Sequence, residues 1–404
     1  MTTSDFDFIN PLLVPAKTRV ILLVIDGLGG LPVTAGGQTE LEAASSPNLD
    51  MLAAEGICGL HQAIGTAITP GSGPSHLALF GYDPRQYQVG RGVMSALGSG
   101  FNLQDGDVAA RGNFCTVDDS GLITDRRAGR IDTDTNQKLC AILREIELPG
   151  VELFVEPVKE YRFLLVLRGS ELSAKITDSD PQQTGHKPRE PEPLIPKAEH
   201  TAELVQHFLE QACKKLSTHE PANMVLLRGF SSRPSWPNFN EVFGLQPAAL
   251  ADYPMYRGVA KLLGMTILNC QDLLEDKIAT LKDQWGNFDF FYVHYKPTDS
   301  AGEDGDAKKK QRCIEAVDRI IPALRELQPA VLIVTGDHSS PAVMKSHSWH
   351  PVPTILWADN CRPDNVKKFG ERTCIGGGLG PRFAATDLIP LALAHAGRLK
   401  KFGA

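Results

Sequence analysis

Acidic and histidine residues follow directly after three short apolar runs of the sequence. Asp26 comes at the end of the first run, Asp299 follows the second, and Asp337 with His338 follows the third, while His347 lies nine residues further on. Carboxylate and imidazole side chains together suit Mn²⁺, Zn²⁺ or Co²⁺, or Mg²⁺ when water completes its shell. Two adjacent ligands can serve one ion or divide between two. The pattern predicts a divalent-metal site without thiolate ligands.

A serine that could carry a phosphoryl group lies in the segment Thr69-Pro-Gly-Ser72-Gly-Pro-Ser75. Glycines flank Ser72, and Pro74 favours the start of a helix because its missing N–H costs nothing there. A hydroxyl at a helix N-terminus meets free N–H groups and the positive end of the helix dipole, which stabilise a phosphate. On this motif alone, Ser72 as a helix cap is the preferred interpretation, and Ser75 and Thr69 are rival nucleophiles.

Metal ions would connect the serine with the acidic residues. Two ions near Ser72 would lower the pKa of its hydroxyl, hold the phosphoryl oxygens and stabilise the leaving oxygen. They would also offset the negative charge of the aspartates, which alone would repel a phosphate. The combination indicates metal-dependent phosphoryl transfer.

The apolar runs themselves predict the elements that position these residues. The runs 20–25, 288–295 and 330–334 have strand length and little alternation, as buried strands of a parallel sheet do. Ligands of open α/β sheets gather at the carboxyl ends of the strands, so we expect the acidic residues to converge. Helices are predicted over 47–54 and over 307–327, where Ile314, Val317, Ile321 and Leu324 share one face. This is the pattern of an α/β core.

The middle of the chain has a different pattern of predicted elements. It contains strand-like runs at 151–155 and 162–167, a helical segment at 201–216 and a proline-rich loop at 187–196. We expect an inserted α+β domain over 101–254, carried by a core domain made of 1–100 and 255–404.

Composition excludes several classes of protein. The chain has 404 residues and a net charge of −7, which argues against a general nucleic-acid surface. No apolar stretch reaches the ~20 residues that span a bilayer. Eight cysteines without a C-x-x-C pair fit neither a disulfide framework nor a zinc ribbon, so a cytoplasmic location is expected. The run Lys308-Lys309-Lys310 is interpreted as a solvated helix face. Nothing indicates the oligomeric state.

Several longer motifs carry a family resemblance. The segments that carry it include Val24-Ile-Asp26-Gly-Leu-Gly29, Glu42-Ala-Ala-Ser-Ser-Pro47, His76-Leu-Ala-Leu-Phe-Gly81, Asp125-Arg-Arg-Ala-Gly-Arg-Ile131, Leu226-Leu-Arg-Gly229 and Lys401-Phe-Gly-Ala404. Together with the Ser72 loop and the metal-ligand pattern, they resemble the alkaline-phosphatase superfamily. More narrowly, they resemble the archaeal-type branch of the cofactor-independent phosphoglycerate mutases, over nearly the whole chain.

The resemblance implies a doubly wound alkaline-phosphatase-like core with an inserted α+β domain. It also implies interconversion of 2-phosphoglycerate and 3-phosphoglycerate, a step of glycolysis and gluconeogenesis, through a phosphoserine on Ser72. Two divalent ions, with Mn²⁺ preferred and Zn²⁺, Co²⁺ or Mg²⁺ as alternatives, and no 2,3-bisphosphoglycerate would be needed. One ion would be held by Asp26, Ser72, Asp337 and His338, and the other by Asp299 and His347.

The resemblance also assigns the phosphoglycerate contacts to the inserted domain. Their candidates are Asp125, Arg126, Arg127, Arg130, Arg228 and Arg233. Arginine suits this role because its planar fork matches carboxylate and phosphate groups. Where many relatives complete the second metal site with a histidine, this chain has Glu303, and Asp304 competes for that role. Where many relatives have a histidine on the glycerate side, this chain has Tyr161.

Two other functions fit the core motifs. One is a metal-dependent phosphatase or phosphomutase acting on another small phosphate ester. The other is a non-catalytic metabolite-binding relative. A mutase conserves organic phosphate, a phosphatase releases inorganic phosphate, and a binding protein does neither.

Overall fold

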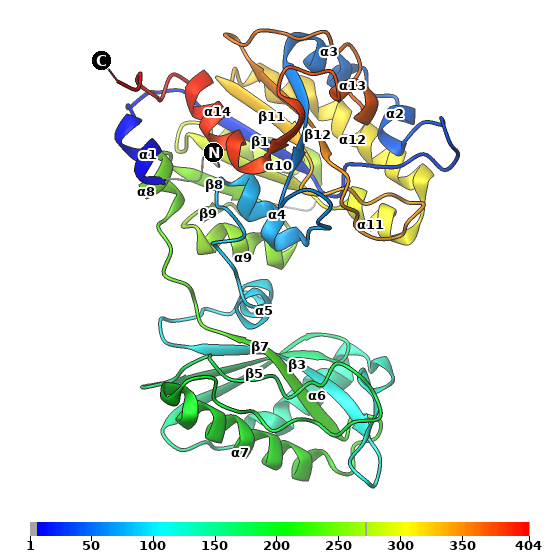
Figure 1. The fold of residues 1–404 in the computed structure, drawn as a ribbon, viewed down its shortest axis with the longest axis vertical. Helices are drawn as coiled ribbons and strands as arrows, with labels where there is room; N and C mark the ends of the chain where they lie inside the picture. The colour runs from blue at the N-terminus through cyan, green and yellow to red at the C-terminus, as the bar shows by residue number, and fades with distance from the viewer. Residues whose placement is uncertain (1–5, 271–272, 404) are drawn as a thin grey trace. The chain divides into compact units, whose positions relative to one another are not determined.

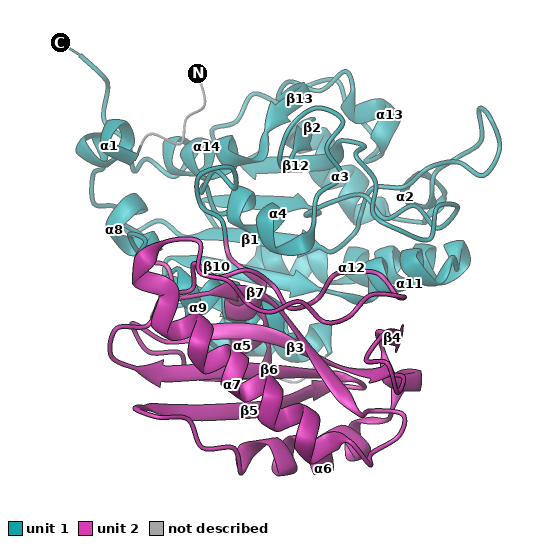
Figure 2. Ribbon diagram, turned by 60° about the horizontal axis from the view of Figure 1, so that its bottom comes forward, with its two compact units in different colours: residues 1–88, 236–404 teal, residues 89–235 magenta. Residues whose placement is uncertain are grey.

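The computed structural model describes residues 6–270 and 273–403. The chain divides into two compact units, one made of residues 1–88 and 236–404 and the other of residues 89–235 (Figures 1 and 2). The first unit is an α/β fold and the second an α+β fold, which confirms the predicted fold class.

One mixed sheet runs through the first unit. Among the described residues its eight strands have the order β13-β2-β12-β11-β1-β10-β8-β9. Their bounds are β1 Val20–Ile25, β2 Ile57–Gln62, β8 Pro247–Leu250, β9 Thr266–Ile267, β10 Phe290–Tyr295, β11 Val331–Thr335, β12 Val352–Ala358 and β13 Gly380–Ala384. The central strand β1 pairs in parallel with both β10 and β11, and all three are completely buried. The three strands predicted from apolar runs are thereby confirmed.

Helices cover both faces of this sheet, which is why its central strands lack alternation. On one face, Ile21, Leu23 and Ile25 of β1 share a core cluster with residues of α3, α10 and α12. Other helices of the unit include α4, α9 and α14 (Figure 1). Their bounds are α2 Glu40–Ala43, α3 Pro47–Glu55, α4 Ser72–Leu79, α9 Pro254–Leu262, α10 Leu274–Asp283, α11 Pro297–Asp304, α12 Ala307–Glu326, α13 Glu371–Cys374 and α14 Leu388–His395.

Helix α12 confirms the helix predicted over 307–327, and its apolar face is buried as expected. The interpretation of Lys308, Lys309 and Lys310 as one solvated face is wrong for the third residue. Lys308 and Lys309 are exposed, but Lys310 is fully buried. The reason is helical phase, because Lys310 lies four residues before the buried Ile314 and so shares its face.

The structure describes every residue of the second unit. This unit is built on an antiparallel sheet of five strands. Strand β3 lies between β6 and β7, with β5 beyond β6 and β4 paired to the end of β3. Helices α6 and α7 share a core cluster with one face, and α5 packs on Ala109, Leu164 and Val166 of the other. The bounds are β3 Val108–Val117, β4 Ile123–Asp125, β5 Val151–Lys159, β6 Arg162–Gly169, β7 Met224–Ser231, α5 Arg91–Ser99, α6 Thr133–Arg144 and α7 Glu199–Leu216.

The chain changes units at 88/89 and 235/236, not at the expected 100/101 and 254/255. Helix α5 lies in the second unit because Val93 and Ala96 join its core cluster. Strand β8 lies in the first unit because it pairs in parallel with β10. Both differences arise from pairings between distant segments, which local composition does not mark.

Candidate active site

The predicted ligands converge at one edge of the first sheet. Asp26 follows β1, Asp299 lies in the first turn of α11 after β10, and Asp337 and His338 follow β11. Because these strands are parallel neighbours, their carboxyl ends meet, and all four side chains are fully buried. His347, from the loop after β11, is half-buried beside them.

One group of ligand atoms surrounds a single point. His338 Nε2 lies 3.4 Å from Asp26 Oδ1, 3.2 Å from Asp337 Oδ2 and 3.2 Å from Ser72 Oγ. Neither Asp26 Oδ1 nor Asp337 Oδ2 has a hydrogen-bond partner among the described residues. Buried carboxylate oxygens without partners are costly. Their convergence with an imidazole and a hydroxyl therefore fits a divalent cation.

The second oxygen of each aspartate is occupied by the protein. Asp337 Oδ1 accepts hydrogen bonds from the N–H groups of Gly27 and His338, at 3.1 and 3.0 Å. Asp26 Oδ2 accepts hydrogen bonds from Tyr256 and from His294 Nε2 at 3.1 Å, and it forms an ion pair with Lys296 Nζ at 3.2 Å. Each carboxylate is thus oriented so that one oxygen remains for the metal.

Protonation in this group follows from burial and charge. Burial opposes ionisation of Asp26, but the hydrogen bond and charge of His294 hold its pKa well below the usual range. Burial and the charge of Asp26 raise the pKa of Asp337 well above its usual value. Burial lowers the pKa of His338 to about 4, so its ring is neutral and able to bind a metal near neutral pH. A divalent ion would replace the proton on Asp337.

A second group lies around His347. Its Nε2 is 3.7 Å from Asp299 Oδ1 and 3.6 Å from Glu303 Oε1, and its ring stacks on His338 with centroids 3.6 Å apart. Asp299, His338 and His347 offer ligand atoms within 4.8 Å of one another. The Glu303 side chain is 52% exposed, so it lies at the rim of this group. Asp304 points instead toward Lys309 Nζ, at 3.5 Å.

Lys296 connects the two groups. Its Nζ lies 3.2 Å from Asp26 Oδ2 and 2.5 Å from Asp299 Oδ2, and the charges of these aspartates raise its pKa despite its burial. One lysine cannot balance the carboxylates of Asp26, Asp299 and Glu303, so the site retains an excess of negative charge that favours cations. His294 could have been found from the sequence, because it is a polar residue inside an apolar run. No sequence pattern marks Tyr256 as a residue of the site.

Ser72 is the first residue of α4, and Gly71 takes the N-cap position without a side-chain cap bond. The interpretation of Ser72 as a helix cap is therefore wrong. Its Oγ is directed toward His338. The rival Ser75 donates its hydroxyl to the Gly71 carbonyl at 3.0 Å, and the rival Thr69 is exposed. The geometry favours Ser72 as the nucleophile.

The second unit contains a separate pocket rich in arginine. Its lining residues are Arg111, Asn113, Arg126, Arg127, Tyr161, Arg162 and Arg228. Arg111 of β3 stands opposite Arg228 of β7, and like charges opposite one another destabilise a sheet. Burial, followed by the charges of Arg162 and Arg228, lowers the pKa of Arg111 to about 10. Such crowding indicates a binding site for an anion.

The pocket differs in part from the arginine set predicted from sequence. Arg126, Arg127 and Arg228 line it, and the buried Asp180 holds Arg126 through two bonds of 3.1 and 2.7 Å. The exposed Arg130 and Arg233 do not line it. Both Asp125 oxygens accept backbone N–H groups, from Arg127 and Gly129. The sequence missed Arg111, Asn113 and Arg162, which gather only through strand register.

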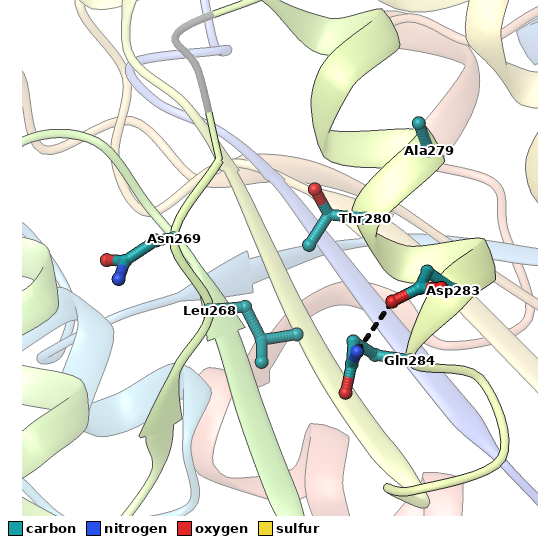
Figure 3. A pocket seen from close by; sticks show the side chains of 6 residues that line it. All are labelled: Leu268, Asn269, Ala279, Thr280, Asp283 and Gln284. Carbon is teal, nitrogen blue, oxygen red and sulfur yellow. Dashed lines mark hydrogen bonds between the residues drawn. The ribbon is translucent and has the colours of Figure 1, made fainter.

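A further pocket of the first unit lies apart from these groups. It is lined by Leu268, Asn269, Ala279, Thr280, Asp283 and Gln284 (Figure 3). It contains none of the predicted site residues, and Asp283 is its one ionisable side chain, paired with Gln284.

Known proteins resemble the chain along its whole length. The family model described as 2,3-bisphosphoglycerate-independent phosphoglycerate mutase matches residues 53–222. A probable 2,3-bisphosphoglycerate-independent phosphoglycerate mutase of Thermus thermophilus is 47% identical, covering 99% of each chain. The chain belongs to this family of phosphoglycerate mutases. The resemblance inferred from the motifs is thereby confirmed.

Solved structures agree with membership in the phosphoglycerate mutase family. A cofactor-independent phosphoglycerate mutase from Thermoplasma acidophilum superposes with a TM-score of 0.75 at 32% identity, covering 94% of this chain and 100% of that one. A protein from Pyrococcus horikoshii superposes with a TM-score of 0.80 at 29% identity, covering 96% and 100%. None of the helices in the described ranges is long and apolar enough to cross a membrane.

Proposed function

We propose that the protein interconverts 2-phosphoglycerate and 3-phosphoglycerate through a phosphoserine on Ser72, without 2,3-bisphosphoglycerate. Membership in the mutase family supports the reaction. The observation that carries the intermediate is the Ser72 hydroxyl at the start of α4, 3.2 Å from His338 Nε2 and beside two unpaired carboxylate oxygens. As part of glycolysis and gluconeogenesis, the reaction would take place in the cytoplasm.

Two half-reactions balance the chemistry. Ser72 Oγ bonds to phosphorus as the bond between phosphorus and the glycerate oxygen breaks, and the serine proton ends on the released hydroxyl. The other glycerate hydroxyl then bonds to phosphorus, the bond to Ser72 breaks, and a proton returns to the serine. The N-terminus of α4 favours the negative charge of the phosphoryl group throughout.

Divalent ions would occupy the two ligand groups of the first unit. Asp26, Asp337, His338 and Ser72 would hold one, and Asp299, His347 and Glu303 the other. When bound, such ions lower the pKa of a hydroxyl and neutralise phosphoryl oxygens. The mixture of carboxylate and imidazole ligands suits Mn²⁺, with Zn²⁺, Co²⁺ and Mg²⁺ as alternatives.

The arginine pocket of the second unit supplies recognition of the glycerate. Phosphoglycerate carries a carboxylate as well as a phosphate, and guanidinium groups bind both through paired hydrogen bonds. Arg111, Arg162 and Arg228 crowd their charges in this pocket, so an anion would relieve their mutual repulsion. Buried Nε atoms of Arg162 and Arg228 lack partners among the described residues and remain available.

The test is product analysis with purified protein, Mn²⁺ and 3-phosphoglycerate, without added 2,3-bisphosphoglycerate. We expect 2-phosphoglycerate to form without release of inorganic phosphate. Ser72→Ala should abolish it, whereas Ser75→Ala, which alters a hydroxyl bonded within α4, should retain it. Release of inorganic phosphate in place of 2-phosphoglycerate would show a phosphatase, and an active Ser72→Ala variant would refute the phosphoserine.

A further inference from the structure

The metal ligands of the first unit lie on two short loops whose backbones share a buried lysine. Lys310 Nζ, on α12, donates to the carbonyl of Gly29 at 2.9 Å and to that of Ser340 at 2.8 Å. Gly29 lies three residues after Asp26, and Ser340 lies two residues after His338. Lys310 is completely buried, so no water competes for these bonds.

Two carboxylates hold the N–H groups of the same loops. Glu371 Oε1, on α13, accepts from Gly30 at 2.7 Å, and Glu40 Oε1, on α2, accepts from Ala342 at 2.7 Å. Glu371 is fixed in turn by the Thr39 hydroxyl, which donates to its Oε2 at 2.6 Å. Three ionisable side chains from three helices thus bind both a carbonyl and an N–H of each loop.

Packing around the loops leaves little freedom for other arrangements. A Cβ added at Gly29 would come within 1.9 Å of Ser339 Oγ, and one added at Gly30 within 1.9 Å of Glu40 Oε2. The Gly29 backbone therefore sits directly against Ser339, and the Gly30 backbone directly against Glu40. Apolar residues at these positions of α12, α2 and α13 would be buried at lower desolvation cost, so the three buried ionisable side chains call for another reason.

We propose that Lys310, Glu40 and Glu371 form a clamp that fixes the spacing of the two ligand loops and thereby sets the affinity for the metal ion held by Asp26, Asp337 and His338. The clamp residues act through the loop backbone, so they are positioning residues. The inference rests on the metal site proposed above and not on the identity of the phosphate ester.

The test uses Mn²⁺ alone, titrated into the purified full chain and followed by electron paramagnetic resonance. Lys310→Met should weaken Mn²⁺ binding at least tenfold. The matched control is Lys308→Met, which changes an exposed lysine of the same run and should bind Mn²⁺ like the wild type. At saturating Mn²⁺, the Lys310→Met enzyme should recover turnover with an unchanged KM for 3-phosphoglycerate.

A second variant keeps the test decisive if Lys310→Met does not fold. Glu371→Ala should speed hydrogen exchange at the Gly30 amide and weaken Mn²⁺ binding at least threefold. Folded Lys310→Met or Glu371→Ala protein with wild-type Mn²⁺ affinity would overturn the clamp, as would a wild-type chain that binds no Mn²⁺. A wild-type chain that binds Mn²⁺ but forms no 2-phosphoglycerate would instead count against the proposed function alone.

Discussion

Tyr256→Phe tests how the protein orients Asp26. The phenol donates to Asp26 Oδ2 and accepts from Lys296 Nζ at 3.2 Å, and the substitution removes both bonds while leaving the ring in place. Tyr292 supplies a matched control, because it is also fully buried but its hydroxyl has no hydrogen-bond partner among the described residues. The two variants remove the same atom from the same unit, one paired with a carboxylate and one unpaired.

The structure sets the expected magnitudes. A hydrogen bond to a charged group contributes about 1.5–3 kcal/mol, so Tyr256→Phe should lower the free energy of unfolding by about 2 kcal/mol. Removing the unpaired Tyr292 hydroxyl should change it by less than about 0.5 kcal/mol or increase it, because a buried group without a partner is itself costly. A loss of about 2 kcal/mol corresponds to a change of roughly 30-fold in the folding equilibrium.

Tryptophan fluorescence during urea unfolding is a suitable measurement. Trp236, Trp285, Trp349 and Trp357 are the four tryptophans of the chain, and all lie in the first unit, so the signal reports on that unit alone. The Tyr256→Phe variant should also bind Mn²⁺ more weakly. Equal losses for the two variants, or a larger loss for Tyr292→Phe, would refute the role of Tyr256 in holding Asp26.

Three further outcomes are expected. In native mass spectrometry, Glu303→Ala should bind one metal ion per chain, and Glu303→His should restore the second ion. Asp304→Ala should not change the number of bound ions. Two ions bound to Glu303→Ala would contradict the role of Glu303 as a ligand. Arg111→Ala should lower kcat/KM for 3-phosphoglycerate roughly 30-fold, which corresponds to about 2 kcal/mol. Arg130→Ala, which changes an exposed arginine, should alter kcat/KM little. Equal losses in the two variants would show that Arg111 does not bind the substrate. Burial raises the pKa of Glu371 from 4.5 to about 7, so its contribution to stability is present below about pH 4.5 and lost as pH rises through about 7. Unfolding in urea between about pH 5 and about pH 8 should therefore show a loss of about 3 kcal/mol that Glu371→Gln reduces, and an unchanged loss in that variant would exclude Glu371 as its source.

Local sequence patterns were sufficient to predict that the candidate metal ligands meet at one edge of the first sheet. Apolar runs without alternation mark buried parallel strands, and parallel strands bring their carboxyl ends together. Asp26, Asp299 and Asp337 could therefore be expected from the sequence to lie close to one another. The hydrogen bond from Tyr256 that orients Asp26 was not predictable, because Tyr256 lies on a helix that is distant from Asp26 in sequence.

The arginine pocket shows what a single sequence conceals. Arg111 and Arg162 are isolated on their own strands, and only the register of β3 with β6 and β7 brings them beside the predicted Arg228. The resemblance assigns Arg126, Arg127 and Arg130 to substrate binding, yet Arg130 is exposed and does not line the pocket. The sequence did contain a signal that Lys310 is buried, because helical phase places it on the same face as Ile314. Its charge instead led to the prediction that it is exposed to solvent.

The interruption of the first unit by the second fixes the order in which the protein can assemble during synthesis. Strand β1 has no neighbours until β10 and β11 have been made, whereas residues 89–235 form a continuous segment that can fold as soon as it emerges. At roughly 5–20 residues per second, the roughly 310 residues between Asp26 and Asp337 take roughly 15 to 60 seconds to synthesise. A nascent chain that ends before β11 should contain a folded arginine pocket and no capacity to bind metal.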